Sequence, residues 1–236
     1  MQLGLYYALS ALLVWGLIVT HRNASATRRH RTLMILALIN AIAYVVNWWY
    51  FYIRSDHILT LLPLQLCNLA VFLIPLALMT QKGVLMDFVF YVCGLGALVA
   101  ILIPGSDYAD TYSMMTISFY VFHFSIFLIP VLAALWGVHS LKPTRKSAIN
   151  LSVMVLVISL TLHGVNLALN TFLDVPANYF FTMRKLAAPI NPAFAFFASL
   201  IPLDYFYLSF AFPILWIYMA LIGGVMKGIN AFSKST

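Results

Sequence analysis

The chain contains no glutamate, and charged residues of any kind are scarce. Only 8% of its 236 residues are charged, against about 25% in an average soluble domain. All six acidic residues are aspartate, whereas Lys and Arg number 13, so the formal net charge is +7. Apolar residues make up 64% of the chain. This composition excludes a soluble domain and indicates an integral membrane protein.

Cysteine is also rare. Cys67 and Cys93 both fall inside apolar runs, and a disulfide-stapled secreted fold needs about four cysteines or more. No basic stripe with interleaved aromatic residues is present, so we expect no nucleic-acid partner. The first apolar run, Leu3–Thr20, has no basic segment before it and no small-residue cleavage site after it. We therefore interpret this run as a first membrane span and not as a cleaved signal.

Apolar runs of about 20 residues, the length that crosses a hydrocarbon core, recur along the whole chain. They predict an all-α fold: a polytopic transmembrane helix bundle with seven spans, forming a single integral membrane domain over residues 1–236. Short connections make consecutive helices antiparallel neighbours. The predicted spans are Leu3–Thr20, Thr32–Ile53, Thr60–Met79, Val84–Ile103, Met114–Val138, Ser147–Asn170 and Tyr205–Met226.

The loop charges predict the orientation. With the N-terminus outside and the C-terminus inside, ten cations lie on the inner side and only Arg54, Arg184 and Lys185 on the outer side. This is a strong positive-inside bias, and opposite sides for the two termini require an odd number of spans. Five of the six aspartates, Asp107 and Asp110 among them, fall outside. We expect a multi-pass protein of a cell membrane, specifically a bacterial plasma membrane.

One loop departs from the short connections. Thr171–Asp204 is long and apolar and contains Pro189, Pro192 and Pro202. Irregular backbone at membrane depth must be covered by protein or line a cavity. We therefore expect this segment to lie on the outer interface or to fold back into the protein.

Three reactive side chains are predicted to share one depth in the outer half of the membrane. Cys67 lies seven residues below Thr60, or about 10 Å at 1.5 Å per residue. His123 lies about nine residues below Met114, and His163 about seven below Asn170. Polar groups inside spans usually face the bundle interior and often mark function.

Other polar residues support a pocket at this depth. One helix face is predicted to carry Ser159, His163, Asn166 and Asn170, and another to carry Asn40, Tyr44 and Asn47. Gln65 and Asn68 flank Cys67. Alternatively, a lone cysteine is a small packing residue, and Asn or Gln joins helices by hydrogen bonds. The shared depth favours a common pocket that opens to the outer leaflet.

A thiol beside an imidazole can perform covalent acyl transfer. The histidine accepts the thiol proton, and the thiolate attacks an ester to form a thioester. Gln65, Asn68 and Asn166 are candidates to orient the histidine or to stabilise the oxyanion, and Arg184 and Lys185 are candidates for a lipid phosphate. The remaining candidate substrate-binding residues are Asn47, Tyr44, Asn170, Asn178 and Tyr179.

Two other site classes compete with acyl transfer. Cys67, His123 and His163 could hold zinc, but no tight ligand spacing is present and no carboxylate lies in the layer. We therefore expect no metal and no cofactor. A transporter would need helices broken near the midplane; Pro75 and Pro130 would allow this, but no inverted repeat is evident.

Several motifs are similar to those of the YwaF-like bacterial integral membrane proteins. Leu62–Asn68 resembles their Pro-Leu-x-Leu-Cys motif, and Phe119–Pro130 resembles their His-bearing span. Asn178-Tyr179-Phe180 followed by Lys185, and then Ile201–Tyr205, resembles their Asn-Tyr-Met-Phe and Pro-Trp-Tyr segments. The likeness runs from about residue 28 to residue 218.

That family is related to a eukaryotic multispan acyltransferase that loads polyunsaturated chains onto ether lysophospholipids through a cysteine. More distantly, it is similar to multispan lipid-ester hydrolases that use a threonine and a histidine. The resemblance implies seven spans, an acyl thioester on Cys67 and His123 as the base. The chain departs from the family at Gln65, where many relatives have His, and at Leu203-Asp204, where an aromatic residue is usual. The departure at Gln65 weakens any role for that position as a proton carrier.

The leading hypothesis is an intramembrane lipid acyltransferase whose partners are membrane phospholipids. Cys67 is the nucleophile, His123 the general base, and His163 with Asn166 orients or stabilises. The alternatives are a non-catalytic lipid or small-molecule binding or transport protein, and a lipid ester hydrolase.

Overall fold

A computed structural model describes residues 2–105, 112–141 and 143–235, and it contains helices and no strand in those ranges. The chain divides into two compact units, Met1–His139 (unit 1) and Ser140–Thr236 (unit 2). The single membrane domain expected for the chain stays a prediction.

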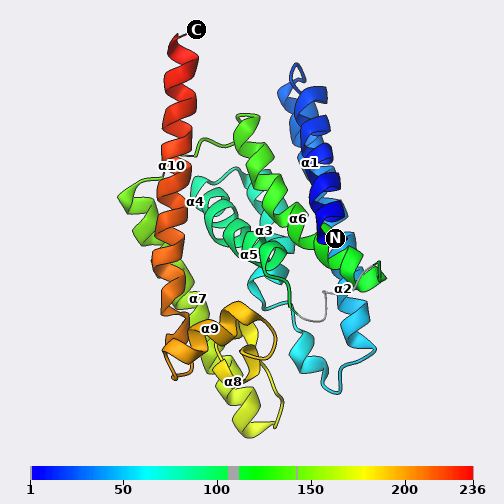
Figure 1. Ribbon diagram of the computed structural model, residues 1–236, viewed down its shortest axis with the longest axis vertical. Coiled ribbons are helices and arrows are strands. Elements are labelled where there is room, and N and C mark those ends of the chain that lie inside the picture. The colour runs from blue at the N-terminus through cyan, green and yellow to red at the C-terminus, as the bar shows by residue number, and fades with distance from the viewer. Residues whose placement is uncertain (1, 106–111, 142, 236) are drawn as a thin grey trace. The chain divides into compact units, whose positions relative to one another are not determined.

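Unit 1 is built of apolar helices joined by short turns (Figure 1). Serine caps begin two of them, because Ser25 accepts the Arg28 N–H and Ser113 accepts the Thr116 N–H. The helices are α1 (Gln2–Thr20), α2 (Ala26–Tyr52), η1 (Ile58–Leu61), α3 (Leu66–Thr80), α4 (Gly83–Asp87), η2 (Phe88–Cys93), α5 (Gly94–Leu102) and α6 (Met114–Leu135).

The centre of unit 1 is α6, which packs against α2, α5, α3 and α1. Its Ile126, Leu132 and Ala133 are completely buried. The outer surface of the unit is apolar as well: Leu38 is 61% exposed and Trp49 58% exposed. Large apolar side chains on the outside of a helical bundle suit contact with lipid tails instead of water.

One apolar run, Gly83–Leu102, changes its helix type along its length. It begins as α4, widens into the π-helix η2 and returns to the α-helical form in α5. All six residues of η2 are buried, and Cys93 ends it. Such π-helical segments frequently occur near functional sites.

Unit 2 begins with α7 (Arg145–Phe172), whose start is fixed by a capping box between Thr144 and Ser147. The chain then forms η4 (Tyr179–Phe181), α8 (Arg184–Ala187), α9 (Pro192–Leu200) and η5 (Phe206–Phe210). The last helix is α10 (Ala211–Ser235). Figure 1 shows the short helices gathered at the end of α7 that leads into them.

Five helical stretches are long and apolar enough to cross a membrane: Ala26–Tyr52, Gly83–Leu102, Met114–Leu135, Arg145–Phe172 and Phe206–Val225. The other two predicted spans contain shorter apolar helices, Tyr6–Thr20 and Leu66–Thr80. The prediction of an all-α, multi-pass membrane protein is confirmed. The number seven and the orientation stay predictions.

The predicted helix Thr60–Met79 begins later than expected, at Leu66. Pro63 explains the delay, because proline disfavours the helical conformation in the residue before it. Leu62 has ψ 143° and Gln65 has ψ 148°, so the backbone is extended on both sides of Leu64. Cys67 therefore lies in the first turn of α3, and its depth cannot be counted from Thr60 at 1.5 Å per residue.

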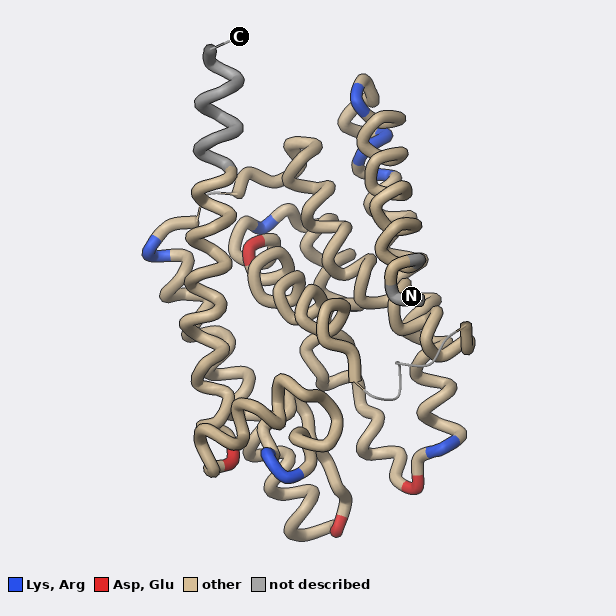
Figure 2. Tube along the Cα trace, viewed as in Figure 1, with Lys and Arg blue, Asp and Glu red and all other residues tan. Residues whose placement is uncertain are grey.

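Charged residues lie at the ends of the helices of unit 1, and the middles of the helices carry none (Figure 2). The basic residues of its N-terminal part gather where α1 turns into α2, and Arg54 and Asp56 follow the other end of α2. Asp107, Asp110 and Lys142, which entered the orientation argument, lie outside the described residues.

Candidate functional site

Cys67 is the second residue of α3, directly at the N-terminus of the helix. The side chain of the N-cap residue Gln65 makes no capping hydrogen bond. The first N–H groups of a helix have no intrahelical acceptor, and they carry the positive end of the helix dipole. Cys67 and Asn68 are therefore placed where backbone N–H groups can stabilise negative charge beside the thiol. Both side chains are partly exposed.

His123 lies on α6 and is 8% exposed. Its Nδ1 is 2.9 Å from the carbonyl oxygen of Phe119. A carbonyl only accepts, so Nδ1 carries the proton, and in the neutral imidazole Nε2 is left with its lone pair. The ring of Phe119 packs against the imidazole with centroids 4.2 Å apart, and that of Phe122 with centroids 4.9 Å apart. This arrangement gives His123 the tautomer of a general base.

The predicted polar face of α2 packs against α6 next to His123. Asn40 is 1% exposed, and its Nδ2 donates to the Phe122 carbonyl at 2.9 Å and to Ser125 Oγ at 2.8 Å. Asn47 Nδ2 donates to Ser118 Oγ at 3.3 Å. Asn40 thus holds the backbone of α6 at the residue before His123, which makes it a positioning residue for the imidazole.

Cys67 lies on α3 and His123 on α6, and these two helices pack against each other; α3 also contacts η2. Cys93, at the end of η2, is completely buried, and both cysteines are free thiols. Within the described residues, Cys67 Sγ has no hydrogen bond to His123. The structure thus brings the helices of the predicted pair together, and the direct thiol–imidazole contact stays a prediction.

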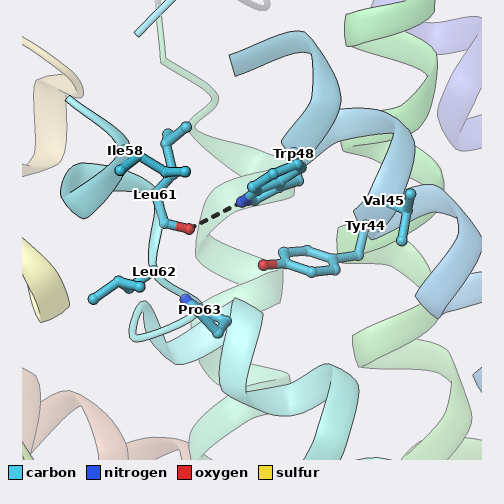
Figure 3. Close-up of a pocket in the computed structure, with 7 residues that line it drawn as sticks. All are labelled: Tyr44, Val45, Trp48, Ile58, Leu61, Leu62 and Pro63. Carbon is cyan, nitrogen blue, oxygen red and sulfur yellow. Dashed lines mark hydrogen bonds between the residues drawn. The ribbon is translucent and has the colours of Figure 1, made fainter. Parts of the chain in front are cut away.

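A groove of about 310 Å³ lies just before α3. Figure 3 shows the Tyr44 hydroxyl pointing across it toward the chain at Leu62 and Pro63. Trp48 Nε1 crosses the same space and donates to the Leu61 carbonyl at 3.0 Å. The α2 wall consists of Tyr44, Val45 and Trp48, and the opposite wall of Ile58, Leu61, Leu62 and Pro63.

In unit 2, the predicted polar face of α7 binds the long segment Thr171–Asp204. Asn166 is completely buried; its Nδ2 donates to the Tyr179 carbonyl at 2.8 Å, and its Oδ1 accepts the Tyr179 N–H at 2.8 Å. Asn170 Nδ2 donates to the Ala177 carbonyl at 2.8 Å. Tyr179 is completely buried as well. The segment therefore folds against the protein, in agreement with one of the two expected arrangements.

His163 is a partly exposed member of this face. Its Nδ1 lies 3.0 Å from Thr182 Oγ1, which also accepts from Asn166 Nδ2 at 2.9 Å. The imidazole packs beside the ring of Tyr205 at a centroid distance of 5.3 Å. Tyr205 Oη is 3.3 Å from Ser159 Oγ. His163 and Asn166 are thus both hydrogen-bonded to Thr182, and the hydrogen-bonded pair Tyr205 and Ser159 joins this polar cluster through the packing of Tyr205 on His163.

The backbone around this cluster is strained. Phe180, Phe181 and Tyr205 have φ values of 55°, 55° and 63°, which non-glycine residues rarely adopt. Such conformations persist where the surrounding structure enforces them, and they gather at functional sites. Here the Tyr205 N–H donates to the Thr182 carbonyl at 2.8 Å.

The predicted phosphate-binding residues stand beside the same turn. The Arg184 N–H donates to Asp204 Oδ1 at 2.7 Å, and Arg184 Nε is buried with no hydrogen-bond partner in the described structure. Lys185 is exposed. Asn178 Oδ1 accepts the Met183 N–H at 2.9 Å, so Asn178 shapes the turn that presents Arg184.

The predicted layer of Cys67, His123 and His163 is divided between the units, with His163 in unit 2. Sequence reasoning missed Thr182 and Tyr205. Thr182 had no visible signal, since its partners are 16 and 19 residues away; the resemblance had drawn attention only to the stretch that ends at Tyr205. In the described ranges, no group of three or more His, Cys or Asp residues is placed to hold a metal ion.

Comparison with known proteins gives one match. The model of the TMEM164 family matches residues 1–223, nearly the whole chain, so the chain belongs to that family. No curated protein and no solved structure matches it. The match supports a multi-pass membrane protein and does not test the resemblance to the YwaF-like proteins.

Proposed function

We propose that this member of the TMEM164 family is an intramembrane lipid acyltransferase, with Cys67 as nucleophile and His123 as general base. It moves an acyl chain from a phospholipid to a lysolipid or another amphiphile through a Cys67 thioester. We propose as well that the chain is related to the YwaF-like proteins and to their eukaryotic acyltransferase relative.

The position of Cys67 in the first turn of α3 is the observation that carries the proposal. A thioester-forming cysteine needs donors aimed at the oxyanion of the tetrahedral intermediate. The N–H groups at the start of α3 have no intrahelical acceptor and no side-chain cap from Gln65. These N–H groups belong to the same helix turn as the Cys67 thiol. Cys93, by contrast, lies in the middle of a continuous helix and is not at a helix start.

In the first half-reaction, His123 Nε2 takes the proton of the Cys67 thiol. The sulfur attacks the ester carbonyl carbon of the phospholipid, and the oxyanion is stabilised at the start of α3. When the ester C–O bond breaks, the departing lysophospholipid oxygen takes the proton from His123. The acyl chain stays on Cys67 as a thioester.

The second half-reaction reverses these roles. His123 Nε2 takes a proton from the acceptor hydroxyl, whose oxygen attacks the thioester carbonyl carbon. The C–S bond breaks, and the Cys67 sulfur receives the proton from His123. With water as acceptor the same steps release a fatty acid, so the acceptor alone separates a transferase from a hydrolase.

The proposal includes contacts to the lipid headgroup. Arg184 and Lys185 bind the phosphate, which is supported by the buried, unpartnered Nε of Arg184. His163 and Asn166 keep the orienting or stabilising roles assigned from the sequence. The proposed placement is a bacterial plasma membrane with the N-terminus outside, so that Arg54, Arg184 and Lys185 face the outer leaflet.

The direct test is intact mass spectrometry of the purified protein after incubation with a defined phospholipid. We expect a hydroxylamine-labile mass increase of one acyl chain in the wild type and none in Cys67→Ala. The matched control is Cys93→Ala, because Cys93 is the other thiol and lies completely buried in η2. It should keep the adduct.

An adduct that survives in Cys67→Ala would overturn the assignment of the nucleophile. No adduct with any phospholipid class, in wild-type protein shown to be folded, would overturn the acyltransferase. Phospholipid flux into sealed vesicles that is unchanged in Cys67→Ala would then establish the alternative, a binding or transport protein.

A further inference from the structure

The groove between α2 and the segment Ile58–Pro63 is lined by hydrocarbon almost throughout. Two polar side-chain atoms reach it. Trp48 Nε1 already donates to the Leu61 carbonyl, whereas the Tyr44 hydroxyl has no hydrogen-bond partner in the described structure. An apolar cleft with a single available hydroxyl suits an apolar ligand that has one hydrogen-bond acceptor at one end.

The rim of the groove is exposed and apolar. Val45 is 59% exposed, Ile58 60% and Leu62 39%. Val45 lies on α2, a helix long and apolar enough to cross a membrane, and Ile58 and Leu62 follow it in the chain, so we infer that these side chains face lipid tails. A ligand that enters past them comes sideways from the bilayer. It does not have to cross water.

The size of the groove limits what it can hold. Its volume of about 310 Å³ lies at the lower end of the range of about 300–1,000 Å³ for small-molecule sites. It therefore accommodates the first part of one hydrocarbon chain, while the rest of a lipid stays in the bilayer.

The groove is close in the chain to the proposed nucleophile. Its Pro63 wall is four residues from Cys67, which is at most about 14 Å even for extended chain. Arg54 follows α2, and its guanidinium carbon lies 3.5 Å from the centroid of the Tyr50 ring.

A second apolar hollow lies in unit 1. This hollow, of about 240 Å³, lies between α1, α5 and α6. The hydroxyl of Tyr7 in its lining is already donated to the Ile101 carbonyl at 2.9 Å. Ser10 is the other hydroxyl-bearing residue of its lining, and no thiol is among the lining residues.

We propose that the groove is a lateral acyl-chain slot, which takes the carboxyl-end part of one acyl chain of an outer-leaflet phospholipid. The Tyr44 hydroxyl donates to the ester carbonyl oxygen, and the remainder of the chain leaves between Val45 and Leu62 into the bilayer. The slot rests on the proposed acyltransferase for the role of Cys67, and binding of the chain does not depend on that role.

The first experiment fills the slot. In Val45→Trp, the rate of Cys67 acylation from a dipalmitoyl phospholipid should fall about tenfold or more, since pocket contacts of this size discriminate by such factors. Acylation from a diacetyl analogue, whose chain has only one methyl group beyond the carbonyl, should continue at the wild-type rate. The matched control is Leu38→Trp, which makes the same kind of change two turns away, at a 61% exposed position outside the groove. Wild-type palmitoylation of folded Val45→Trp would overturn the slot.

The second experiment does not depend on thioester formation. Cys67→Ala protein in vesicles of phosphatidylcholine is cross-linked with a phosphatidylcholine that carries a diazirine near the carboxyl end of one chain. We expect labelling of the peptide that contains Leu62 to exceed labelling around Leu38, to saturate with probe concentration and to be lost in Cys67→Ala/Val45→Trp. Equal, non-saturating labelling at both places would overturn the slot.

Together the two experiments separate the two proposals. Saturable labelling of the groove in a protein whose wild type forms no thioester would leave the slot standing and remove the acyltransferase. Thioester formation in the wild type, with no preferred labelling of the groove, would remove the slot and leave the acyltransferase standing.

Discussion

The side-chain amide of Asn166 binds both backbone polar groups of Tyr179, with 2.8 Å between donor and acceptor on each side. Both residues are completely buried. A backbone N–H and a carbonyl taken out of water need such partners, because an unsatisfied buried group is costly. One amide on α7 therefore anchors the irregular segment that carries Arg184 and Tyr205.

Replacing Asn166 with Leu should lower the free energy of unfolding of unit 2. It leaves Tyr179 N–H, Tyr179 O and Thr182 Oγ1 without the amide, and each unsatisfied buried group costs about 1–3 kcal/mol. Thermal unfolding in nanodiscs measures the loss, and limited proteolysis between residues 171 and 204 locates it. Leu167→Ala, at the neighbouring 45% exposed position, is the control with little expected effect. Wild-type protease resistance in Asn166→Leu would contradict the anchoring role.

The Asn40 amide should couple energetically to Ser125. Hydrogen bonds between membrane helices are worth about 0.6 kcal/mol on average and about 1.7 kcal/mol at most. Asn40→Ala removes the bonds to Ser125 Oγ and to the Phe122 carbonyl, whereas Ser125→Ala removes the first of these and the bonds that Ser125 Oγ donates to the Val121 and Phe122 carbonyls within α6. In a double-mutant cycle of unfolding, we expect a positive coupling within that range. Additive losses would contradict a direct bond.

His123→Asn should slow thioester formation without unfolding the protein. The shorter amide can still donate to the Phe119 carbonyl, but it has no basic nitrogen in place of Nε2. General base catalysis contributes about 10²–10⁴-fold, so the rate of Cys67 acylation should fall by about that factor. Time-resolved intact mass spectrometry measures it. His57→Ala, at an exposed loop position, serves as the control and should keep the wild-type rate. A His123→Asn rate within a few-fold of wild type would remove His123 as the base.

Two substitutions of Asp174 should change the free energy of unfolding in opposite directions. It follows the end of α7 with φ 51°, its side chain is exposed, and a left-handed conformation costs a non-glycine residue up to about 1–2 kcal/mol. Asp174→Gly should raise the free energy of unfolding by a few tenths of a kcal/mol, because glycine also loses more entropy on folding. Asp174→Val should lower it by about 1 kcal/mol, because a branched side chain resists this conformation. Equal unfolding free energies for both variants would show that this φ is not kept in solution.

Periodicity predicted which side chains share a helix face, because the α-helix repeat depends only on local geometry. The spacing of Ser159, His163, Asn166 and Asn170 gave the polar face of α7, and all four side chains form hydrogen bonds in unit 2. The same reasoning gave the face of α2 that meets α6 through Asn40 and Asn47. The partners of these faces were not predictable in the same way, since Thr182 and Ser125 are distant in the chain.

The start of α3 shows where local patterns fail. Hydropathy extended the apolar run back to Thr60, and the continuous helix expected there would have placed Cys67 in its second turn. Pro63 was visible in the sequence, but hydropathy does not register the conformation that it imposes on Leu62. The resulting break is what places Cys67 at an open helix N-terminus and creates the opposite wall of the groove.

The sequence by itself determined that this is an all-helical, multi-pass membrane protein, because the length and hydrophobicity of its segments are set by bilayer thickness and by the cost of burying charge. It also determined which polar residues line each helix face. Only the tertiary structure decided what those faces bind: the amide of Asn166 holds a strained turn, and Asn40 holds the helix that carries His123. Such pairings depend on contacts between residues far apart in the chain, which no local periodicity encodes.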